Sequence, residues 1–275
     1  MDVVNVLWGV WFVLGAFVGS FLNVCIYRMP REQSVVVPRS RCPECNHPIA
    51  WFDNVPLVSD VMLGGRCRHC RGVIHWRYPV VEALSGIAAV AVVQRFGVTP
   101  LSTVYLVFVW ALIVVSMIDL EHRIIPDEIS VYGRWIGMAL SFLIPLLHGT
   151  GSREIALGRS MIGAMVGGGL LYVTGIVGSV IFRKEAMGGG DVKLLAMAGS
   201  LLGWKLVTLT FFLAPLLAIV PGIGVLLVKR SHEIPYGPFL SLALVLSLFV
   251  GQTLIQLSGI EDSFRLLWVY YGQGS

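Results

Sequence analysis

Long apolar stretches separated by short polar segments dominate the chain. A helix needs about 17–25 mostly apolar residues to cross the hydrocarbon core of a bilayer. Eight stretches approach this pattern and predict transmembrane helices, and the shortest of them is a candidate for a tilted or re-entrant helix. They are residues 3–27, 79–93, 101–118, 129–147, 155–182, 192–202 with Gly203, 206–228 and 236–257.

The composition supports an all-α polytopic membrane protein rather than a soluble enzyme. Hydrophobic residues make up 56% of the chain and charged residues only 13%. The net charge of +4 is not gathered on one amphipathic surface, so no nucleic-acid partner is expected. The first stretch lacks a preceding basic segment and a small-residue cleavage motif, which favours a retained helix over a signal peptide.

The distribution of Lys and Arg predicts the orientation. With eight spans, the most basic loops all fall on one side of the membrane, and the positive-inside rule assigns that side to the cytoplasm. The N-terminus then faces outward, and the ends of the stretches that carry Asp119 and Asp191 both face the cytoplasm. The basic residues are Arg28, Arg31, Arg39, Arg41, Arg66, Arg68, Arg71, Arg77, Arg123, Arg183, Lys184, Lys229 and Arg230.

Two C-x2-C pairs lie in the long loop after the first stretch: Cys42 with Cys45, and Cys67 with Cys70. Two such pairs offer four thiolates to one tetrahedral ion, as in structural zinc sites. Iron and paired disulfides are the alternatives, and disulfides would require an oxidising compartment. The loop therefore predicts a small metal-stabilised domain in the cytoplasm.

Two acids mark the ends of apolar stretches. Asp119 closes one, and Asp191 follows a glycine run and opens another. A carboxylate at the edge of a membrane span is a functional hypothesis by default. Two carboxylates that share a proton supply the acid and the base for peptide hydrolysis. The alternative for Asp191 is a simple helix cap, which is also our interpretation of Asp127.

Several motifs, taken in order, resemble one known family. The chain is similar to the type IV prepilin peptidases, the bifunctional leader peptidase and N-methyltransferase family of membrane aspartyl proteases with a G-x-G-D motif. The resemblance runs nearly end to end. Its motifs are Gly19-Ser20-Phe21-Leu22-Asn23-Val24 with Arg28 and Pro30, the two cysteine pairs, Asn54-Val55-Pro56-Leu57, Arg77-Tyr78-Pro79 with Glu82, Ile118-Asp119, Pro126-Asp127, Gly188-Gly189-Gly190-Asp191-Val192-Lys193-Leu194-Leu195 and Pro235-Tyr236-Gly237-Pro238.

This resemblance implies a function and a set of site residues. Asp119 and Asp191 are the implied catalytic pair, and the four cysteines are the implied zinc ligands. The implied substrate is a prepilin or pseudopilin in the bacterial inner membrane, cut after a Gly at the cytoplasmic face. The new N-terminal residue, usually Phe, is then methylated with S-adenosylmethionine, for which no binding residues can be assigned.

The expected organisation has four parts: a first transmembrane helix (1–27), a cytoplasmic zinc-binding domain (28–78), a transmembrane protease domain (79–257) and a tail (258–275). Other hypotheses are a different G-x-G-D intramembrane protease without methyltransferase activity, a proton- or cation-coupled transporter, and a non-enzymatic assembly factor. The cysteine loop and the 235–238 motif count against the other protease. The absence of an inverted repeat counts against the transporter.

Overall fold

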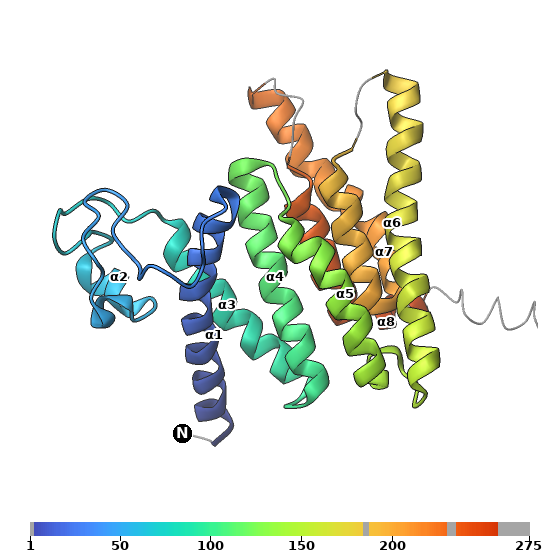
Figure 1. The fold of residues 1–275 in the computed structure, drawn as a ribbon, viewed down its shortest axis with the longest axis horizontal. Helices are drawn as coiled ribbons and strands as arrows, with labels where there is room; N and C mark the ends of the chain where they lie inside the picture. The colour runs from blue at the N-terminus through green and yellow to red at the C-terminus, as the bar shows by residue number, and fades with distance from the viewer. Residues whose placement is uncertain (1–2, 184–186, 230–234, 258–275) are drawn as a thin grey trace, which may run out of the picture. The chain divides into compact units, whose positions relative to one another are not determined.

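The computed structural model describes residues 3–183, 187–229 and 235–257, and within them every regular element is a helix (Figure 1). The expected all-α fold is confirmed. Lys184, Arg230 and the tail 258–275 lie outside the described residues. The elements are α1 (Val3–Arg28), η1 (Met29–Arg31), η2 (Trp51–Asn54), α2 (Val58–Leu63), α3 (Arg77–Phe96), α4 (Pro100–His122), α5 (Asp127–Leu143), η3 (Pro145–His148), α6 (Arg153–Phe182), α7 (Gly189–Lys229) and α8 (Gly237–Leu257).

The chain forms two compact units, residues 1–129 and 130–275. In the first unit, α1 packs against α3 through glycines. A Cβ added at Gly15 or Gly19 would overlap atoms of α3, so only glycine allows this approach of the two helices. Ile26, Val81 and Ile118 form the buried core that joins α1, α3 and α4.

Polar contacts show which ends of these three helices lie together. Near the end of α1, the side-chain amide of Asn23 donates to the carbonyl of Tyr78 at the start of α3, at 3.1 Å. Arg77, also at the start of α3, forms an ion pair with Glu121 in the last turn of α4. The end of α1, the start of α3 and the end of α4 therefore lie on one side of the unit, where the cysteine loop connects α1 to α3.

In the second unit, α6 and α7 pack through another pair of glycines. Gly163 and Gly199 face each other, and a Cβ on either would overlap the carbonyl of the other. Gly167 approaches the carbonyl of Leu195 in the same way. Gly163 and Gly167 thus allow close packing of α6 against α7.

α7 contains the two apolar stretches 192–202 and 206–228, separated by a break at Gly203. Gly203 has φ 79° and ψ 169°, which is not helical. The break interrupts the local hydrogen bonding of the helix, and two hydroxyls bind the carbonyl of Ser200 beside it. Ser160 Oγ donates to this carbonyl at 2.7 Å and Ser141 Oγ at 3.1 Å. Neighbouring helices thereby satisfy a backbone group at the break, which a bilayer cannot do.

His148 in η3 completes this cluster. Its Nε2 lies 2.9 Å from Ser141 Oγ, and burial lowers the pKa of His148 below its usual value. A neutral imidazole suits this position, because a buried charge without a counter-ion is costly.

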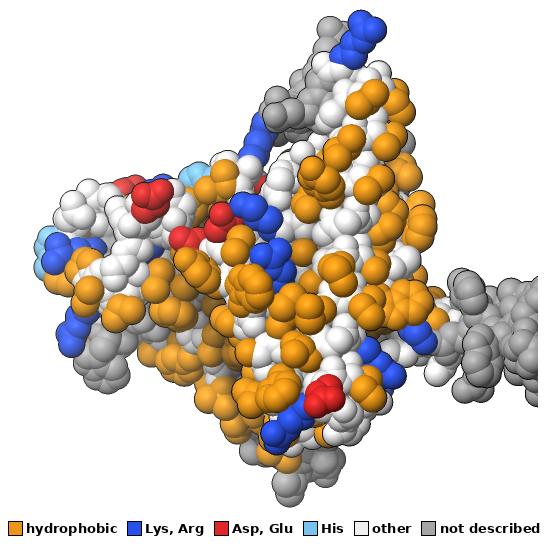
Figure 2. All heavy atoms as spheres, turned by 45° about the vertical axis from the view of Figure 1, so that its right-hand side comes forward, with side chains coloured by type: hydrophobic (Ala, Val, Ile, Leu, Met, Phe, Trp, Pro, Cys, Tyr) orange, Lys and Arg blue, Asp and Glu red, His pale blue; other side chains and the backbone are white. Residues whose placement is uncertain are grey.

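In the part of the chain that the structure describes, six helices are long and apolar enough to cross a membrane: α1, α3, α4, α6, α7 and α8. The other two expected spans are accounted for by α7, which combines two stretches, and by α5, which has only 17 residues. α5 is shorter than the predicted 129–147 stretch because Pro145 starts η3. Hydrophobic side chains cover much of the visible surface of the helices (Figure 2), as expected for a lipid-facing protein.

The glycine contact between α6 and α7 generates a test. Gly163→Ala is expected to lower the unfolding temperature in detergent, because overpacking typically costs about 1–3 kcal/mol. Gly169→Ala in the same helix is the matched control, since nothing lies within 4 Å of a Cβ there. Both changes gain the same helix propensity. Equal unfolding temperatures for the two variants would contradict the predicted packing role.

Candidate functional site

The four loop cysteines converge on one point in the first unit. Cys42, Cys45, Cys67 and Cys70 place their sulfurs within 4.8 Å of one another. The Sγ atoms of Cys42 and Cys70 are 3.8 Å apart, and all four are free thiols. A tetrahedral ion with metal–sulfur bonds of about 2.3 Å requires sulfurs about 3.8 Å apart. The cluster therefore has the dimensions of a tetrahedral metal site, and the disulfide alternative is not what the structure shows.

The two cysteine pairs sit in backbone knuckles of the same design. In each, the first cysteine N–H donates to a carbonyl five residues later, and its own carbonyl accepts from the residue after the second cysteine. That last residue has positive φ, which turns the chain tightly behind the two sulfurs. The bonds are Cys42 N–H to His47 O and Asn46 N–H to Cys42 O, then Cys67 N–H to Gly72 O and Arg71 N–H to Cys67 O.

The pKa values of Cys67 and Cys70 indicate that four neighbouring thiols need a positive charge beside them to ionise together. The backbone N–H groups of Cys70 and His69 lower the pKa of Cys67 to about 7. The Gly72 N–H favours the thiolate of Cys70, but burial and the neighbouring thiols raise the pKa of Cys70 to about 12. The four groups cannot all ionise beside one another without a cation, and a bound metal ion supplies that charge.

The nearby histidines do not belong to this cluster of candidate ligands. His47 and His69 stack on each other, with ring centroids 4.2 Å apart, one from each knuckle. The group of candidate ligands found among the described residues consists of the four cysteines.

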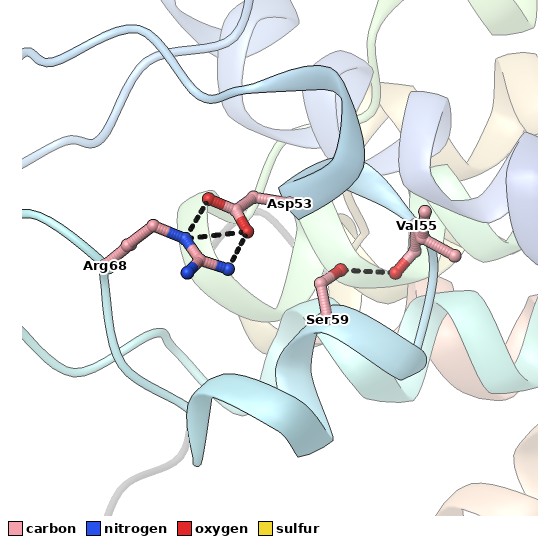
Figure 3. A network of polar contacts seen from close by, with 4 residues as sticks. All are labelled: Asp53, Val55, Ser59 and Arg68. Carbon is pink, nitrogen blue, oxygen red and sulfur yellow. Dashed lines mark hydrogen bonds and ion pairs between the residues drawn. The ribbon is translucent and has the colours of Figure 1, made fainter.

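An ion pair ties the segment between the knuckles to the second knuckle. Asp53 in η2 accepts three hydrogen bonds from the guanidinium of Arg68 (Figure 3). Nε lies 2.8 Å from Oδ2 and 3.1 Å from Oδ1, and Nη2 lies 2.7 Å from Oδ1. The hydrogen bond from Arg68 holds the pKa of Asp53 below its usual range. Ser59 bonds the carbonyl of Val55 at the start of α2 (Figure 3). These contacts order a loop that has little hydrophobic core.

Asp119 is buried in the last turn of α4, with 7% of its surface exposed. The helix continues to His122 rather than ending at Asp119, and Arg123 in the left-handed region terminates it. Glu121, two residues further on, holds Arg77 at the start of α3. Within the first unit, Asp119 therefore lies at the same end of the helices as the cysteine loop, as its place in the sequence predicts.

Asp191 is buried in the first turn of α7, with 9% of its surface exposed. Gly188 lies beside it, so close that an added Cβ would be 3.2 Å from Asp191 Oδ2. The charge of the same carboxylate acts on Tyr236, just before α8. Burial and then the charge of Asp191 raise the pKa of Tyr236 to about 12. The 235–238 motif and the glycine-aspartate motif thus meet within the second unit.

The structure brings the four cysteines together. Asp119 belongs to the first unit and Asp191 to the second, and each is buried at the end of its own helix. Asp127 is the first residue of α5, and its interpretation as a helix cap stays a prediction.

A cavity in the first unit adds residues that sequence reasoning did not assign. It has a volume of about 590 Å³ and lies between α1, α3 and the cysteine loop. Glu82 and Asn23 line it, and both are buried. The feature of the sequence that could have indicated this site is Glu82 itself, because it is a lone acid inside an apolar stretch. The sequence did not reveal the cavity, because its walls come from segments far apart in the chain.

Comparison with known proteins agrees with these features. Residues 13–96 match the family described as Bacterial Peptidase A24 N-terminal domain, and residues 106–223 match the Type IV leader peptidase family. No solved structure gives a significant match to the chain.

Curated relatives carry a single name, "Prepilin leader peptidase/N-methyltransferase". The protein from Aeromonas hydrophila is 35% identical, over 88% of this chain and 90% of its own length. The one from Pseudomonas aeruginosa is 31% identical, over 90% of this chain and 93% of its own length. The one from Myxococcus xanthus is 42% identical over 78% of this chain and 62% of its own length. With matches of this extent, and with both family regions present in order, the chain belongs to the type IV leader peptidase family.

Proposed function

We propose that this protein removes the leader of type IV prepilins or pseudopilins and N-methylates the new N-terminus. The observation that carries the proposal is its similarity over nearly the full length to relatives with both activities in their name. The buried acids at the ends of α4 and α7, and the cysteine cluster, supply residues suited to that chemistry.

The peptidase step uses Asp119 and Asp191 as a dyad. Like charges held close cannot both ionise, so one carboxyl keeps its proton while the other acts as a base. The base takes a proton from water, and the water oxygen bonds to the scissile carbonyl carbon. The protonated carboxyl donates to the carbonyl oxygen. The C–N bond then breaks, and the departing amine takes a proton.

The position of the acids fits a substrate that enters from the membrane. A prepilin has a basic leader, then a Gly, then an apolar helix that begins, usually, with Phe. We assign the cysteine loop and both aspartates to the cytoplasmic face of the inner membrane, with the N-terminus outside. The arginines around the loop support this orientation. A cut at the membrane edge then separates the basic leader from the apolar helix.

Residues 28–78 act as a zinc-binding domain within the first unit. Cys42, Cys45, Cys67 and Cys70 would hold the ion. Four thiolate ligands are typical of structural zinc rather than catalytic zinc, which keeps an open position. The ion would cross-link two knuckles in a loop with few buried apolar residues. The remaining parts are the helix 1–27, the protease domain 79–257 and the tail 258–275.

S-adenosylmethionine would supply the methyl group for the second activity. The neutral α-amino nitrogen of the new N-terminus would take the methyl group from the sulfonium, which would leave as a neutral thioether, and the amine proton would go to solvent. The amine must therefore lose its charge first, which occurs readily near its ordinary pKa of about 8.

The dyad is tested by leader cleavage in liposomes. Asp119→Asn and Asp191→Asn are each expected to reduce the cleavage rate of a prepilin by roughly 10³–10⁴-fold, because neither variant keeps two groups that exchange a proton. Asp127→Asn is the control, since Asn caps a helix as well as Asp. Normal cleavage by either dyad variant would rule out the proposed mechanism.

The methyltransferase activity is tested by the mass of the product. With S-adenosylmethionine present, the mature N-terminal peptide is expected to gain the mass of one methyl group. Cleavage without any such gain, at saturating methyl donor, would instead favour a leader peptidase with no second activity.

The cysteine cluster is tested by metal analysis of the purified protein. We expect about one zinc ion per chain, and loss of the ion in Cys42→Ser and Cys67→Ser, because a hydroxyl replaces a thiolate ligand poorly. Cys25→Ser in α1 should keep the ion. Iron in place of zinc, or full zinc in Cys67→Ser, would contradict the assignment.

A further inference from the structure

We propose that the cavity between α1, α3 and the cysteine loop is the binding site for S-adenosylmethionine, with Glu82 as the buried anion that recognises its positive charge. This inference rests on the proposed methyltransferase activity and deepens it by locating the site. The cavity volume of about 590 Å³ lies within the range of roughly 300–1,000 Å³ typical of small-molecule sites.

The cavity is enclosed by three parts of one unit. The last turns of α1 and the start of α3 form one wall, and the cysteine loop forms the other. Its lining mixes aliphatic and aromatic groups with charged ones. The residues on which the proposal depends are Asn23, Arg28, Ala50, Asp60 and Glu82.

Glu82 is a buried acid with no basic partner. Only 8% of its surface is exposed, and its Oε2 accepts the N–H of Leu57 at 2.8 Å. Ser20 also donates to the carboxylate, and the charge that acts on Glu82 is that of Asp60, which is another acid. Among the described residues, no ion pair includes Glu82. A buried anion of this kind favours a cationic ligand, because an unpaired buried charge is costly.

Asn23 supplies a second, independent observation. Only 1% of its surface is exposed, and its amide nitrogen donates to the carbonyls of Gly19 and Tyr78. Its Oδ1 atom is buried and has no hydrogen-bond partner in the structure. An unsatisfied buried acceptor is rare in folded proteins, and this one belongs to a residue in the wall of the cavity.

The other charges on the cavity argue against a basic leader as its occupant. Arg28 donates to the carbonyls of Ser34 and Pro38, and Arg39, Arg41 and Arg68 also lie on the loop side. These cations disfavour a peptide rich in Lys and Arg. A small zwitterion with one extra positive charge suits them better. Its carboxylate can face an arginine while its cationic end faces Glu82.

The charge argument predicts discrimination between the methyl donor and its product. S-adenosylmethionine carries a sulfonium, and S-adenosylhomocysteine has a neutral thioether in its place. An anion that recognises the added charge should therefore bind the donor more tightly than the product. Removal of that anion should reduce the difference between them.

The test measures equilibrium binding of both compounds to the full-length protein in liposomes, without substrate. Glu82→Gln is expected to weaken binding of S-adenosylmethionine about 10–100-fold and that of S-adenosylhomocysteine by less than about 3-fold. Glu32→Gln is the matched control, because Glu32 is an exposed acid of the same unit that does not line the cavity. It should bind both compounds as the unchanged protein does.

A second variant keeps the test decisive if Glu82→Gln does not fold, as judged by metal content and unfolding temperature. Ala50→Trp fills the cavity from the loop and should abolish binding of both compounds. Normal binding of both to a folded Ala50→Trp protein would overturn the proposed site. An unchanged ratio of the two affinities in Glu82→Gln would overturn the role of its charge.

Failure of the proposed function has a different signature. If the unchanged protein binds neither compound and never methylates a cleaved substrate, the methyltransferase activity itself is absent. If it binds and methylates while Glu82→Gln and Ala50→Trp bind both compounds normally, the activity stands and the site lies elsewhere.

Discussion

A bilayer offers no hydrogen-bond partner to a polar group, and this constraint governs the structure. Helices satisfy their backbone internally, so the described spans are all helical. Where a helix breaks, another helix must satisfy the backbone. At Gly203 this role falls to Ser141 and Ser160, which both donate to the carbonyl of Ser200. The break persists because two neighbouring helices, α5 and α6, supply the missing partners.

The same constraint concentrates the chemistry at helix ends. Asp119 lies in the last turn of α4 and Asp191 in the first turn of α7. At a helix end, water and a substrate backbone can approach the carboxylate although a hydrophobic span lies next to it. Glu82 and Asn23 lie near the ends of α3 and α1 that adjoin the cysteine loop, in the wall of the cavity. These polar groups are thus tied to a helix end or to the cavity.

The cysteine loop is held together in a different way. Among its residues whose burial is described, only two apolar side chains are buried, those of Cys42 and Pro56. Its order depends on backbone knuckles, on the Asp53–Arg68 ion pair and on four converging thiols. A metal ion would join the two knuckles across the loop. The loop also forms one wall of the cavity, and α1 and α3 form the other. In the proposed function, a metal ion that orders the loop therefore also orders this wall of the ligand site.

Much of this architecture is visible in the sequence. The apolar stretches predicted the helices, because a spanning helix needs apolar side chains over the fixed thickness of the hydrocarbon core. The C-x2-C spacing predicted the convergence of four thiols, since each pair needs only a local turn. The sequence also singled out Asp119 and Asp191, because a lone acid stands out against an apolar stretch.

The sequence by itself determined local patterns, namely the spans, the knuckles and the positions of acids along the helices. Only the tertiary structure decided the break at Gly203, the close approach of α1 and α3, and the cavity around Glu82. Each of these depends on atoms from elements distant in the chain: the hydroxyls that satisfy Ser200, the glycines that admit α3, and the loop residue Leu57 that bonds Glu82. Spacing along one segment carries no information about such partners, whereas the packed fold does.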